Sequence, residues 1–494
     1  MTDLADLTIA EVGLGLRSGD FSSVELLDAV ARRATMTEAQ LHAYLLLDTA
    51  GAARAAEDAD AAFRDGVDRG PLQGIPLAVK DNMCTEGVET TASSQILAGW
   101  IPPYDATVVR RLKEAGSVIV GKTNLDEFAM GSSTENSAFG ETRNPWNPDR
   151  VPGGSSGGSA ATVAAGSAFG SLGSDTGGSI RQPAALCGVV GMKPTYGLVS
   201  RYGLIAFASS LDQIGPFARS VADAATILEA IAGWDRYDAT SIDAPVPDLS
   251  GSLGAGVDGL RIGLVTDLMG EGIDPQVRAA VAETAKRLEA EGAEVVEVSL
   301  PSTEYALSAY YLIAPAECSS NLARFDGVRY GHRADVGGTS GDMMSRTRAE
   351  GFGPEVIRRV LLGTYALSAG YYDAFYGQAQ RVRTLVRRDF EAAYEQVDAL
   401  ISPTSPTTAF RVGERAADPI EMYYSDICTI PSNLAGDPAI SLPIGLDDAG
   451  LPIGFQVMAP ALGEEMMFRI AGAVESMVAF TERAPLATSE VTEP

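Results

Sequence analysis

Glycine and serine are concentrated in one stretch, from residue 151 to 188, which reads VPGGSSGGSAATVAAGSAFGSLGSDTGGSIRQPAALCG. Because glycine permits left-handed and close-approach conformations, such a stretch can bring several backbone N–H groups and hydroxyls into one small volume. Ser179 follows two glycines and precedes a predicted helix, so the N–H groups of residues 176–179 could stabilise an oxyanion. A flexible linker is the alternative, but the alanine-rich run at 160–165 favours a folded segment. A serine nucleophile at this position would still need a base.

The choice of base is restricted by composition. Only two histidines, His42 and His332, occur among the 494 residues, which limits both imidazole catalysis and imidazole metal sites. Two overlapping G-x-S-x-G matches, centred on Ser155 and Ser156, would fit a nucleophile elbow of the α/β-hydrolase kind. That alternative needs a downstream histidine, and His332 is the one candidate. The other possible bases are carboxylate and lysine.

Lys80 differs from the other lysines because it ends an apolar strand, IPLAV, at 75–79. Burial would lower the pKa of its side chain, because desolvation penalises the charged ammonium, and would make a neutral amine available near pH 7. The structural alternative is a lysine whose stem packs on the strand while its ammonium reaches water.

A second motif, GSVIVGKT at 116–123, matches the P-loop expression G-x-x-x-x-G-K-[ST]. A phosphate-binding loop follows a strand, whereas residues 117–120 of this match are themselves typical of a strand. The sequence therefore disfavours an ATPase, and Lys122 is interpreted as a structural residue or part of a rim.

The elements around these residues indicate parallel β-α-β connections. The strand at 75–79 is followed by a helix over 105–116 and by a strand at 117–120. The same order recurs at RIGLV, 261–265, where the next helix has Asp274 as its N-cap and is followed by AEVVEVSL. Strand, helix and strand in this order imply a parallel sheet.

The whole chain, 1–494, is predicted to form one large α/β domain, with a mixed, largely parallel central sheet covered by helices on both faces. Ser22 and Glu25 form an S-x-x-E capping box at the start of one helix. The expected parts are an N-terminal helical layer (1–65), a catalytic core (66–232), a C-terminal part (260–483) that follows a loop rich in Gly, Pro, Ser and Asp, and a loose tail (484–494).

The composition predicts a globular protein that does not bind nucleic acid by itself. Hydrophobic residues make up 46% of the chain and charged residues 21%. The net charge of −28 would repel phosphate backbones. The N-terminus lacks the features of a signal peptide, and no apolar run is long enough for a membrane span, so we expect a cytoplasmic protein. Four scattered cysteines without a C-x-x-C pair argue against a zinc site and a disulfide framework, and no metal site is expected.

Four segments, GIPLAVKDN, GKTNLDEFAMG, PGGSSGGSAA and GSDTGGSIRQPAALCG, resemble the amidase signature family and follow its order. The resemblance implies a serine amidase with a Ser-Ser-Lys triad, which falls on Lys80, Ser155 and Ser179. In that family the bridging serine lies in a cis peptide bond, here Gly154–Ser155.

The mechanism that this resemblance implies is proton transfer through two serines. Neutral Lys80 would draw a proton through Ser155, which would deprotonate Ser179 as it attacks the amide carbon and forms an acyl-enzyme. Lys80 would later return the proton to the leaving ammonia. The oxyanion N–H groups would come from Thr176, Gly177, Gly178 and Ser179.

Two longer segments, SAYYLIAPAECSSNLARFDGVRYG and GFGPEVIRRVLLGTYALSAGYYDAFYGQAQRVR, resemble the glutamine-hydrolysing subunits of tRNA-dependent amidotransferases. Glutamine carries an α-carboxylate and an α-ammonium beside its reactive amide, so a selective site needs one cation and one anion. By similarity Arg359 binds the carboxylate, Asp426 binds the ammonium and Tyr310 lines the site.

This second resemblance also implies a three-subunit complex. The chain would release ammonia from glutamine and pass it through a protein channel to a B subunit (GatB). That subunit would activate glutamyl-tRNA(Gln) with ATP and Mg²⁺, while a small C subunit (GatC) holds the pair. No cofactor is expected in this chain. A free-standing amidase acting on other amides and a non-catalytic scaffold in the same assembly are the alternatives that the residues leave open.

Overall fold

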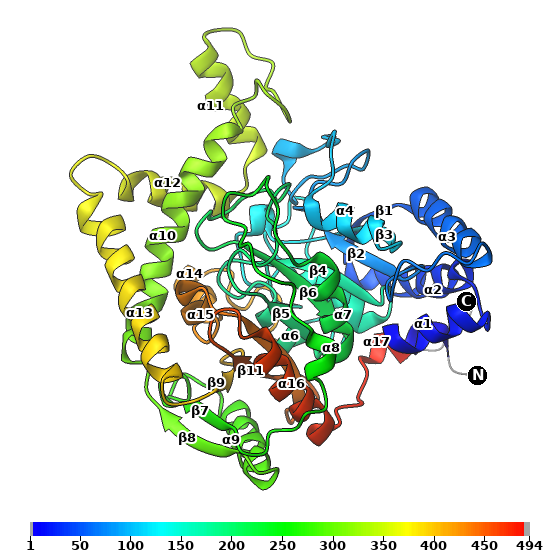
Figure 1. The fold of residues 1–494 in the computed structure, drawn as a ribbon. Helices are drawn as coiled ribbons and strands as arrows, with labels where there is room; N and C mark the ends of the chain where they lie inside the picture. The colour runs from blue at the N-terminus through cyan, green and yellow to red at the C-terminus, as the bar shows by residue number, and fades with distance from the viewer. Residues whose placement is uncertain (1–2, 489–494) are drawn as a thin grey trace.

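One sheet of eleven strands runs through residues 3–488, the part of the chain that the computed structural model describes (Figure 1). Its strand order is β1-β3-β2-β4-β6-β5-β10-β11-β9-β7-β8. The expected α/β class with a mixed central sheet is confirmed. The strands are β1 (Tyr44–Leu47), β2 (Pro76–Lys80), β3 (Val118–Thr123), β4 (Gly170–Asp175), β5 (Val190–Lys193), β6 (Gln213–Ala218), β7 (Arg261–Val265), β8 (Glu294–Val298), β9 (Ala399–Pro403), β10 (Ala439–Leu446) and β11 (Pro452–Met458).

Parallel pairing forms two blocks in this sheet, β3-β2-β4 and β9-β7-β8. In the first block a helix over Thr107–Glu114 connects β2 to β3, and in the second a helix over Pro275–Ala290 connects β7 to β8. Both β-α-β connections predicted from the sequence are therefore confirmed. Between the two blocks, β6, β5, β10 and β11 pair antiparallel with their neighbours, as the edge strand β1 does with β3.

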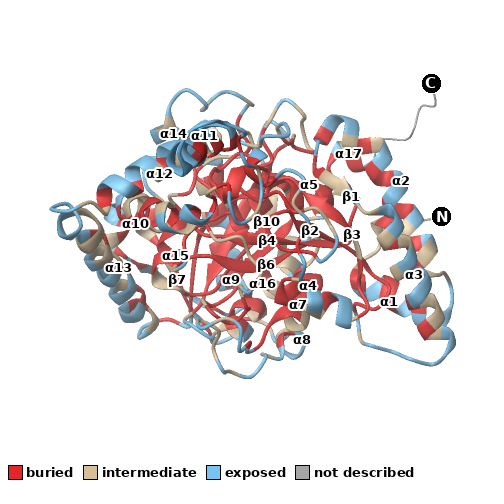
Figure 2. Ribbon diagram, turned by 90° about the horizontal axis from the view of Figure 1, so that it is seen from above, coloured by how far each residue is buried: buried red, intermediate tan, exposed pale blue. Residues whose placement is uncertain are grey.

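Helices cover both faces of the sheet (Figure 2). A Cβ on Gly170 of β4 would meet Ile227 of α7, whereas a Cβ on Gly173 would meet Ile180, just before α6. Residues three apart in a strand face opposite sides, so α6 and α7 lie on opposite faces. The helices are α1 (Ile9–Ser18), α2 (Ser23–Leu41), α3 (Thr49–Arg64), α4 (Thr107–Glu114), α5 (Gly157–Ala165), α6 (Arg181–Cys187), α7 (Val221–Ile231), α8 (Leu249–Ser252), α9 (Pro275–Ala290), α10 (Ala306–Asn321), α11 (Ser340–Gly351), α12 (Pro354–Ala366), α13 (Gln378–Tyr394), α14 (Pro419–Tyr424), α15 (Ile430–Ala435), α16 (Glu464–Val478) and α17 (Pro485–Thr488).

The N-terminal segment is helical, as expected, apart from one strand. The capping box of Ser22 and Glu25 is present at the start of α2. Tyr44–Leu47, however, forms β1 and pairs with β3 at the edge of the sheet. Four consecutive apolar residues are too short a pattern to separate a strand from a helix, which is why the sequence missed this element.

Two other boundaries differ from the expectation. Helix α4 begins at Thr107 and not at Asp105, and the Asp105 carboxylate pairs with Lys113 and does not cap the helix. At the C-terminus, where the sequence suggested a loose tail, α17 packs against α2 and α5. The rest of the expected tail, 489–494, lies outside the described residues.

Helices α12 and α13 both pack against α10 at one side of the molecule (Figure 1). Helix α12 can approach α10 closely because Gly363 has no side chain. A Cβ at this position would lie 1.8 Å from the carbonyl oxygen of Pro315. The inner faces of these helices form a hydrophobic core, with Ile313, Val356 and Phe390 among its members, that is distinct from the main core on the sheet. Among residues 3–488, no helix is both long and apolar enough to cross a bilayer.

Candidate active site

Lys80 is the last residue of β2, and its side chain is fully buried. Its Nζ donates hydrogen bonds to three serine hydroxyls, Ser156 Oγ at 2.7 Å, Ser155 Oγ at 2.8 Å and Ser174 Oγ at 3.0 Å. Burial lowers the pKa of Lys80 to about 7, although nearby carboxylates act in the opposite direction. A substantial fraction of Lys80 is therefore neutral at pH 7 and able to accept a proton.

Ser155 lies just before α5, in a cis peptide bond with Gly154. Its carbonyl oxygen accepts a hydrogen bond from the N–H of Asp126 at 3.2 Å. The carboxylate of Asp126 accepts N–H groups from Thr134 at 2.9 Å and Asn136 at 3.1 Å. The loop that begins at Asp126 thus holds the backbone of Ser155 while Lys80 holds its hydroxyl.

Ser179 lies in the turn between β4 and α6, and only 8% of its surface is exposed. Ser156 donates its N–H to the carbonyl of Ser179 at 3.2 Å, which links the two serine segments. The buried Asp175 organises the turn, because its carboxylate accepts the N–H of Ile180 at 3.1 Å and pairs with Arg181 at 3.1 Å. Although burial opposes ionisation, Arg181 lowers the pKa of Asp175 to about 2, so the carboxylate is charged at neutral pH.

The backbone N–H groups beside Ser179 are the candidate oxyanion donors. Gly178, one of the residues expected to supply such a donor, instead donates its N–H to Asp175 Oδ1 at 2.8 Å. The N–H groups of Thr176, Gly177 and Ser179 have no acceptor among residues 3–488. Three backbone donors at this turn are therefore free to bind a developing negative charge.

Tyr310, on α10, lies over this turn. A Cβ on Gly177 would come within 2.7 Å of the Cζ atom of Tyr310, and a Cβ on Gly178, at φ +134°, would come within 2.1 Å of Oγ1 of Thr429. Both positions therefore require glycine. Burial raises the pKa of the Tyr310 hydroxyl, which keeps this ring neutral.

Arg359 projects from α12 into the interior, and only 3% of its surface is exposed. Its Nε donates to Glu355 Oε1 at 2.7 Å, and its guanidinium lies 5.3–5.5 Å from the ring centres of Phe207, Tyr311 and Tyr423. Within residues 3–488 its two Nη atoms have no hydrogen-bond acceptor. A guanidinium held at one edge presents its other edge for bidentate binding of a carboxylate.

Asp426 lies between α14 and α15, and it is also buried. Its Oδ2 accepts a hydrogen bond from Ser132 Oγ at 2.5 Å, whereas its Oδ1 has no partner among the described residues. Thr429 Oγ1 bridges the carbonyls of Asp426, at 3.1 Å, and Gly177, at 2.7 Å, and so joins this segment to the Ser179 turn. Burial raises the pKa of Asp426 to about 7. An unpartnered buried carboxylate oxygen is costly unless a ligand satisfies it.

The expected residues thus form two groups. One contains Lys80 and Ser155, which are directly hydrogen bonded, and Ser179, which is linked to them through Ser156. The other contains Arg359 and Asp426, joined to the first through Thr429 and Tyr310.

Sequence reasoning missed several contacts of both groups. Ser156 and Ser174 bind Lys80, and Ser132 binds Asp426. These serines lie in or directly beside the quoted motifs, so their position was a usable signal. Glu355 lies within one of the two longer quoted segments, four residues before Arg359, and Tyr423 lies three residues before Asp426, so a position on the same helix or loop was a signal for them too.

The structure does not bring the other candidate residues to this site. Lys122 is buried in β3, where it pairs with Asp81 at 3.1 Å, and β3 includes the middle of the P-loop match. His332 pairs with the surface residue Glu350 at 3.0 Å. His42 ends α2. None of these residues can serve as the base for Ser179.

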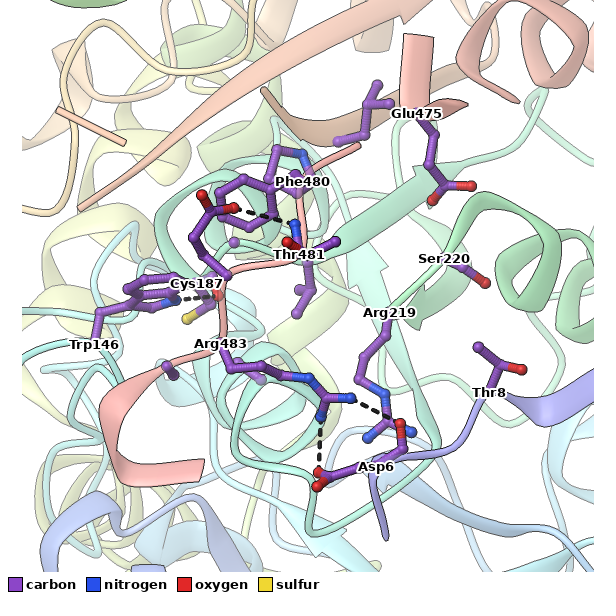
Figure 3. Close-up of a pocket in the computed structure, with 17 residues that line it drawn as sticks. Asp6, Thr8, Trp146, Cys187, Arg219, Ser220, Glu475, Phe480, Thr481 and Arg483 are labelled. Atoms are coloured by element: carbon purple, nitrogen blue, oxygen red, sulfur yellow. Dashed lines mark hydrogen bonds and ion pairs between the residues drawn. The ribbon is translucent and has the colours of Figure 1, made fainter. Parts of the chain in front are cut away.

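The cavity of about 350 Å³ in Figure 3 lies elsewhere, between the N- and C-terminal segments. Its arginines already bind protein groups: Arg483 pairs with Asp6 at 2.9 Å, and Arg219 donates to the carbonyl of Ala5 at 2.7 Å. None of the expected site residues lines this cavity.

A buried lysine bonded to serine hydroxyls, beside a turn with free N–H groups, is an arrangement that can support serine chemistry without histidine. The chain belongs to the amidase family, whose model matches residues 25–468.

Several relatives are similar over nearly their whole length. The chain is 59% identical over 484 residues to a protein from Salinispora arenicola named as the A subunit of glutamyl-tRNA(Gln) amidotransferase, and the match covers 97% of this chain and 98% of the relative. It is 57% identical over 483 residues to a protein of the same name from Moorella thermoacetica, with 98% and 99% covered.

Solved structures give the same fold. The crystal structure of the A subunit of glutamyl-tRNA(Gln) amidotransferase from Thermotoga maritima matches with a TM-score of 0.82 and 43% identity, covering 99% of both chains. The native peptide amidase from Stenotrophomonas maltophilia matches with a TM-score of 0.83 and 34% identity, covering 97% of this chain and 99% of the other.

Proposed function

We propose that this chain is the glutamine-hydrolysing subunit of an amidotransferase that converts glutamyl-tRNA(Gln) to glutaminyl-tRNA(Gln). The observation that carries the proposal is the pair of buried opposite charges, Arg359 and Asp426, beside the Ser179 turn. Each keeps hydrogen-bonding capacity that no described protein group uses, the Nη atoms of Arg359 and the Oδ1 of Asp426. The α-carboxylate and α-ammonium of glutamine complement these two groups.

In the proposed reaction Ser179 is the nucleophile. The Oγ of Ser179 attacks the amide carbon of glutamine. As it does so, Ser155 accepts the proton of Ser179, and neutral Lys80 accepts the proton of Ser155. The oxyanion binds the free N–H groups of the turn. When the C–N bond breaks, Lys80 returns its proton through Ser155 to the leaving amine, and ammonia departs. Water then attacks the acyl-enzyme along the same proton path and releases glutamate.

Ammonia released in this way is useful only to a partner that receives it. The outer face of α12 supports such a partner, because apolar side chains there face solvent: Leu361 is 65% exposed and Tyr365 is 52% exposed. The Tyr365 ring lies 4.7 Å from that of Tyr371, which is also exposed. Contiguous exposed apolar groups mark interaction surfaces. We therefore assign this face to the interface with the B and C subunits.

The proposal also divides the chemistry among the subunits. This chain needs no cofactor, since its own lysine and serines move the proton. ATP and Mg²⁺ act at the B subunit, which also binds the tRNA, in agreement with the net charge of −28 on this chain. The complex would work in the cytoplasm.

A free-standing amidase is the second candidate, because the peptide amidase has the same fold. Fold alone does not identify the substrate.

The decisive experiment measures ammonia release from glutamine by the purified chain, alone and with B and C subunits, ATP and glutamyl-tRNA(Gln). We expect release to rise with the partners and to vanish in Ser179→Ala. If the partners have no effect and another amide is turned over faster, the free-standing amidase is the correct function.

A further inference from the structure

The loop after β3 touches both halves of the site through two consecutive acidic residues. The N–H of Asp126 binds the carbonyl of Ser155 at 3.2 Å, as described above. The next residue, Glu127, is 2% exposed, and its Oε2 accepts the N–H of Gly353 at 2.8 Å. Glu127 takes no part in the proposed chemistry, yet its carboxylate is buried against the helix that carries Arg359.

Glu127 supplies the N-terminal cap that α12 lacks locally. Gly353 is the N-cap residue of α12 and has no side chain to bind the first N–H groups. Glu127, 226 positions earlier in the chain, accepts instead the N–H of Gly353 itself, as the N3 residue of a capping box would. Ser94 completes the clamp, because its Oγ hydrogen bonds to Glu127 Oε1 and lies 3.1 Å from the carbonyl of Gly351. Burial raises the pKa of Glu127 to about 7, and both the carboxylate and the carboxylic acid keep an oxygen that can accept this N–H.

The backbone around this clamp is held in an unusual conformation. Phe128 and Ala129 have φ values of 52° and 63°, and the facing residues Ala92 and Ser93 have values of 51° and 56°. Phe128 donates its N–H to the carbonyl of Ala92 at 2.9 Å. Left-handed conformations cost energy for residues other than glycine, and they persist where the surroundings impose them, often at functional sites.

The ring of Phe128 extends the clamp to the same helix start. It packs edge-on against Phe352, the residue before Gly353, with ring centres 5.7 Å apart, and it lies 4.9 Å from the ring of Phe325. The ring of Phe128 therefore holds Phe352, and the carboxylate of Glu127 holds Gly353, at the junction of α11 and α12.

The position of this junction sets the position of Arg359. Arg359 lies six residues beyond Gly353, about 9 Å along a rigid helix at 1.5 Å per residue. Glu355, which binds Arg359 Nε, lies in the first turn of the same helix. A shift of the helix start would therefore move the guanidinium and its partner together.

We infer that Glu127 is a positioning residue that determines specificity for the α-carboxylate of the substrate, by fixing the start of α12 and hence Arg359. The inference rests on the proposed function, since it assumes that Arg359 binds this carboxylate. In this view the loop of Asp126 and Glu127 keeps the carboxylate-binding helix at a fixed distance from the triad.

The test is a double-mutant cycle between Glu127→Leu and Arg359→Ala, with kcat and KM for glutamine measured in each variant. Glu127→Leu should raise KM on the order of tenfold, with a smaller change in kcat, because the displaced Arg359 binds the carboxylate poorly. In the Arg359→Ala background the same change should leave KM nearly unaltered. Equal effects in both backgrounds would overturn the inference.

Two further variants separate positioning from folding. Glu127→Gln keeps an oxygen acceptor for the N–H of Gly353, so its KM for glutamine should lie close to that of the wild type. If Glu127→Leu does not fold, Ser94→Ala takes its place in the cycle, and it should raise KM more mildly. Glu25→Gln is the matched control, because Glu25 also accepts a backbone N–H at a helix start, at 2.7 Å, but in α2. It should leave KM unchanged. If the wild-type chain does not hydrolyse glutamine at all, the proposed function fails, whereas additive effects in an active enzyme refute only the role of Glu127.

Discussion

The region around Ser179 and the region around Arg359 are built in different ways. The first uses serines, glycines and one lysine on short segments between β2 and α6, and its side chains are buried. The second takes Arg359, Asp426 and Tyr310 from helices and loops far apart in the sequence, and the reverse side of one of these helices faces solvent (Figure 2). Proton transfer requires a fixed short path, while recognition requires only that two charges lie at a set spacing. The peptide amidase shares the fold, and so the second region is where substrate choice should be decided.

Ser179→Ala should have the largest effect and should separate the two regions. Removing the nucleophile should lower kcat on the order of 10³-fold or more, as for other covalent catalysts. Glutamine should still bind, since Arg359 and Asp426 are intact. Calorimetry on this variant checks the second part, and a complete loss of glutamine binding would contradict the division into two regions.

Arg359→Ala should have the converse effect. Loss of a charge-assisted pair with the substrate carboxylate should raise KM for glutamine about 10- to 100-fold, with a smaller effect on kcat. Steady-state kinetics of ammonia release gives both constants. A KM equal to that of the wild type would remove Arg359 from the binding site.

Leu361→Asp should weaken the complex with the B and C subunits about tenfold or more, because a charge would be buried at the centre of an apolar contact. Ammonia release by the isolated chain should not change, since Leu361 points away from Arg359. Leu14→Asp, on the exposed face of α1, is the control, because Leu14 is similarly exposed at 71%. Comparable loss of binding in both variants, measured by calorimetry, would argue against the α12 face.

The pH dependence of kcat/KM for glutamine should report the titration of one group from each region. The change expected near neutral pH is smaller than the effects of the three substitutions above. In the proposed reaction Lys80 acts as the neutral amine and Asp426 as the carboxylate, and burial brings the pKa of each to about 7. Both active forms are deprotonated, so kcat/KM for glutamine should fall as pH decreases through 7, with a slope approaching two on logarithmic axes. In Asp426→Asn the slope of the residual activity should approach one. A profile that rises toward acidic pH would exclude Lys80 as the base.

The sequence was informative about the first region because its residues lie within motifs. Lys80 ends an apolar run, and Ser179 follows paired glycines, so local pattern and elementary chemistry lead to both. The same reasoning recovered the two β-α-β units, whose helices and strands are continuous in the chain. It missed β1, whose four residues pair with a strand more than seventy positions away.

The second region could be approached only through family resemblance. Nothing in the local pattern distinguishes Arg359 from other helical arginines, because its surroundings come from Phe207, Tyr311 and Tyr423, on three separate segments. The contact of Glu127 with Gly353 is also invisible to any pattern of period 2 or 3.6. Such contacts depend on tertiary packing, which a single sequence does not display.

The course of the chain through the sheet has a consequence for synthesis on the ribosome. Strands β2, β4 and β6 are all complete by residue 218, so the backbone around the triad can assemble early in translation. Arg181, which holds Asp175 beside the nucleophile, donates to Ser432 Oγ at 2.7 Å and to Gln456 Oε1 at 2.7 Å. A nascent chain therefore carries the Ser179 segment long before the residues that fix it have been translated, and a truncated product would contain the proposed nucleophile without its support.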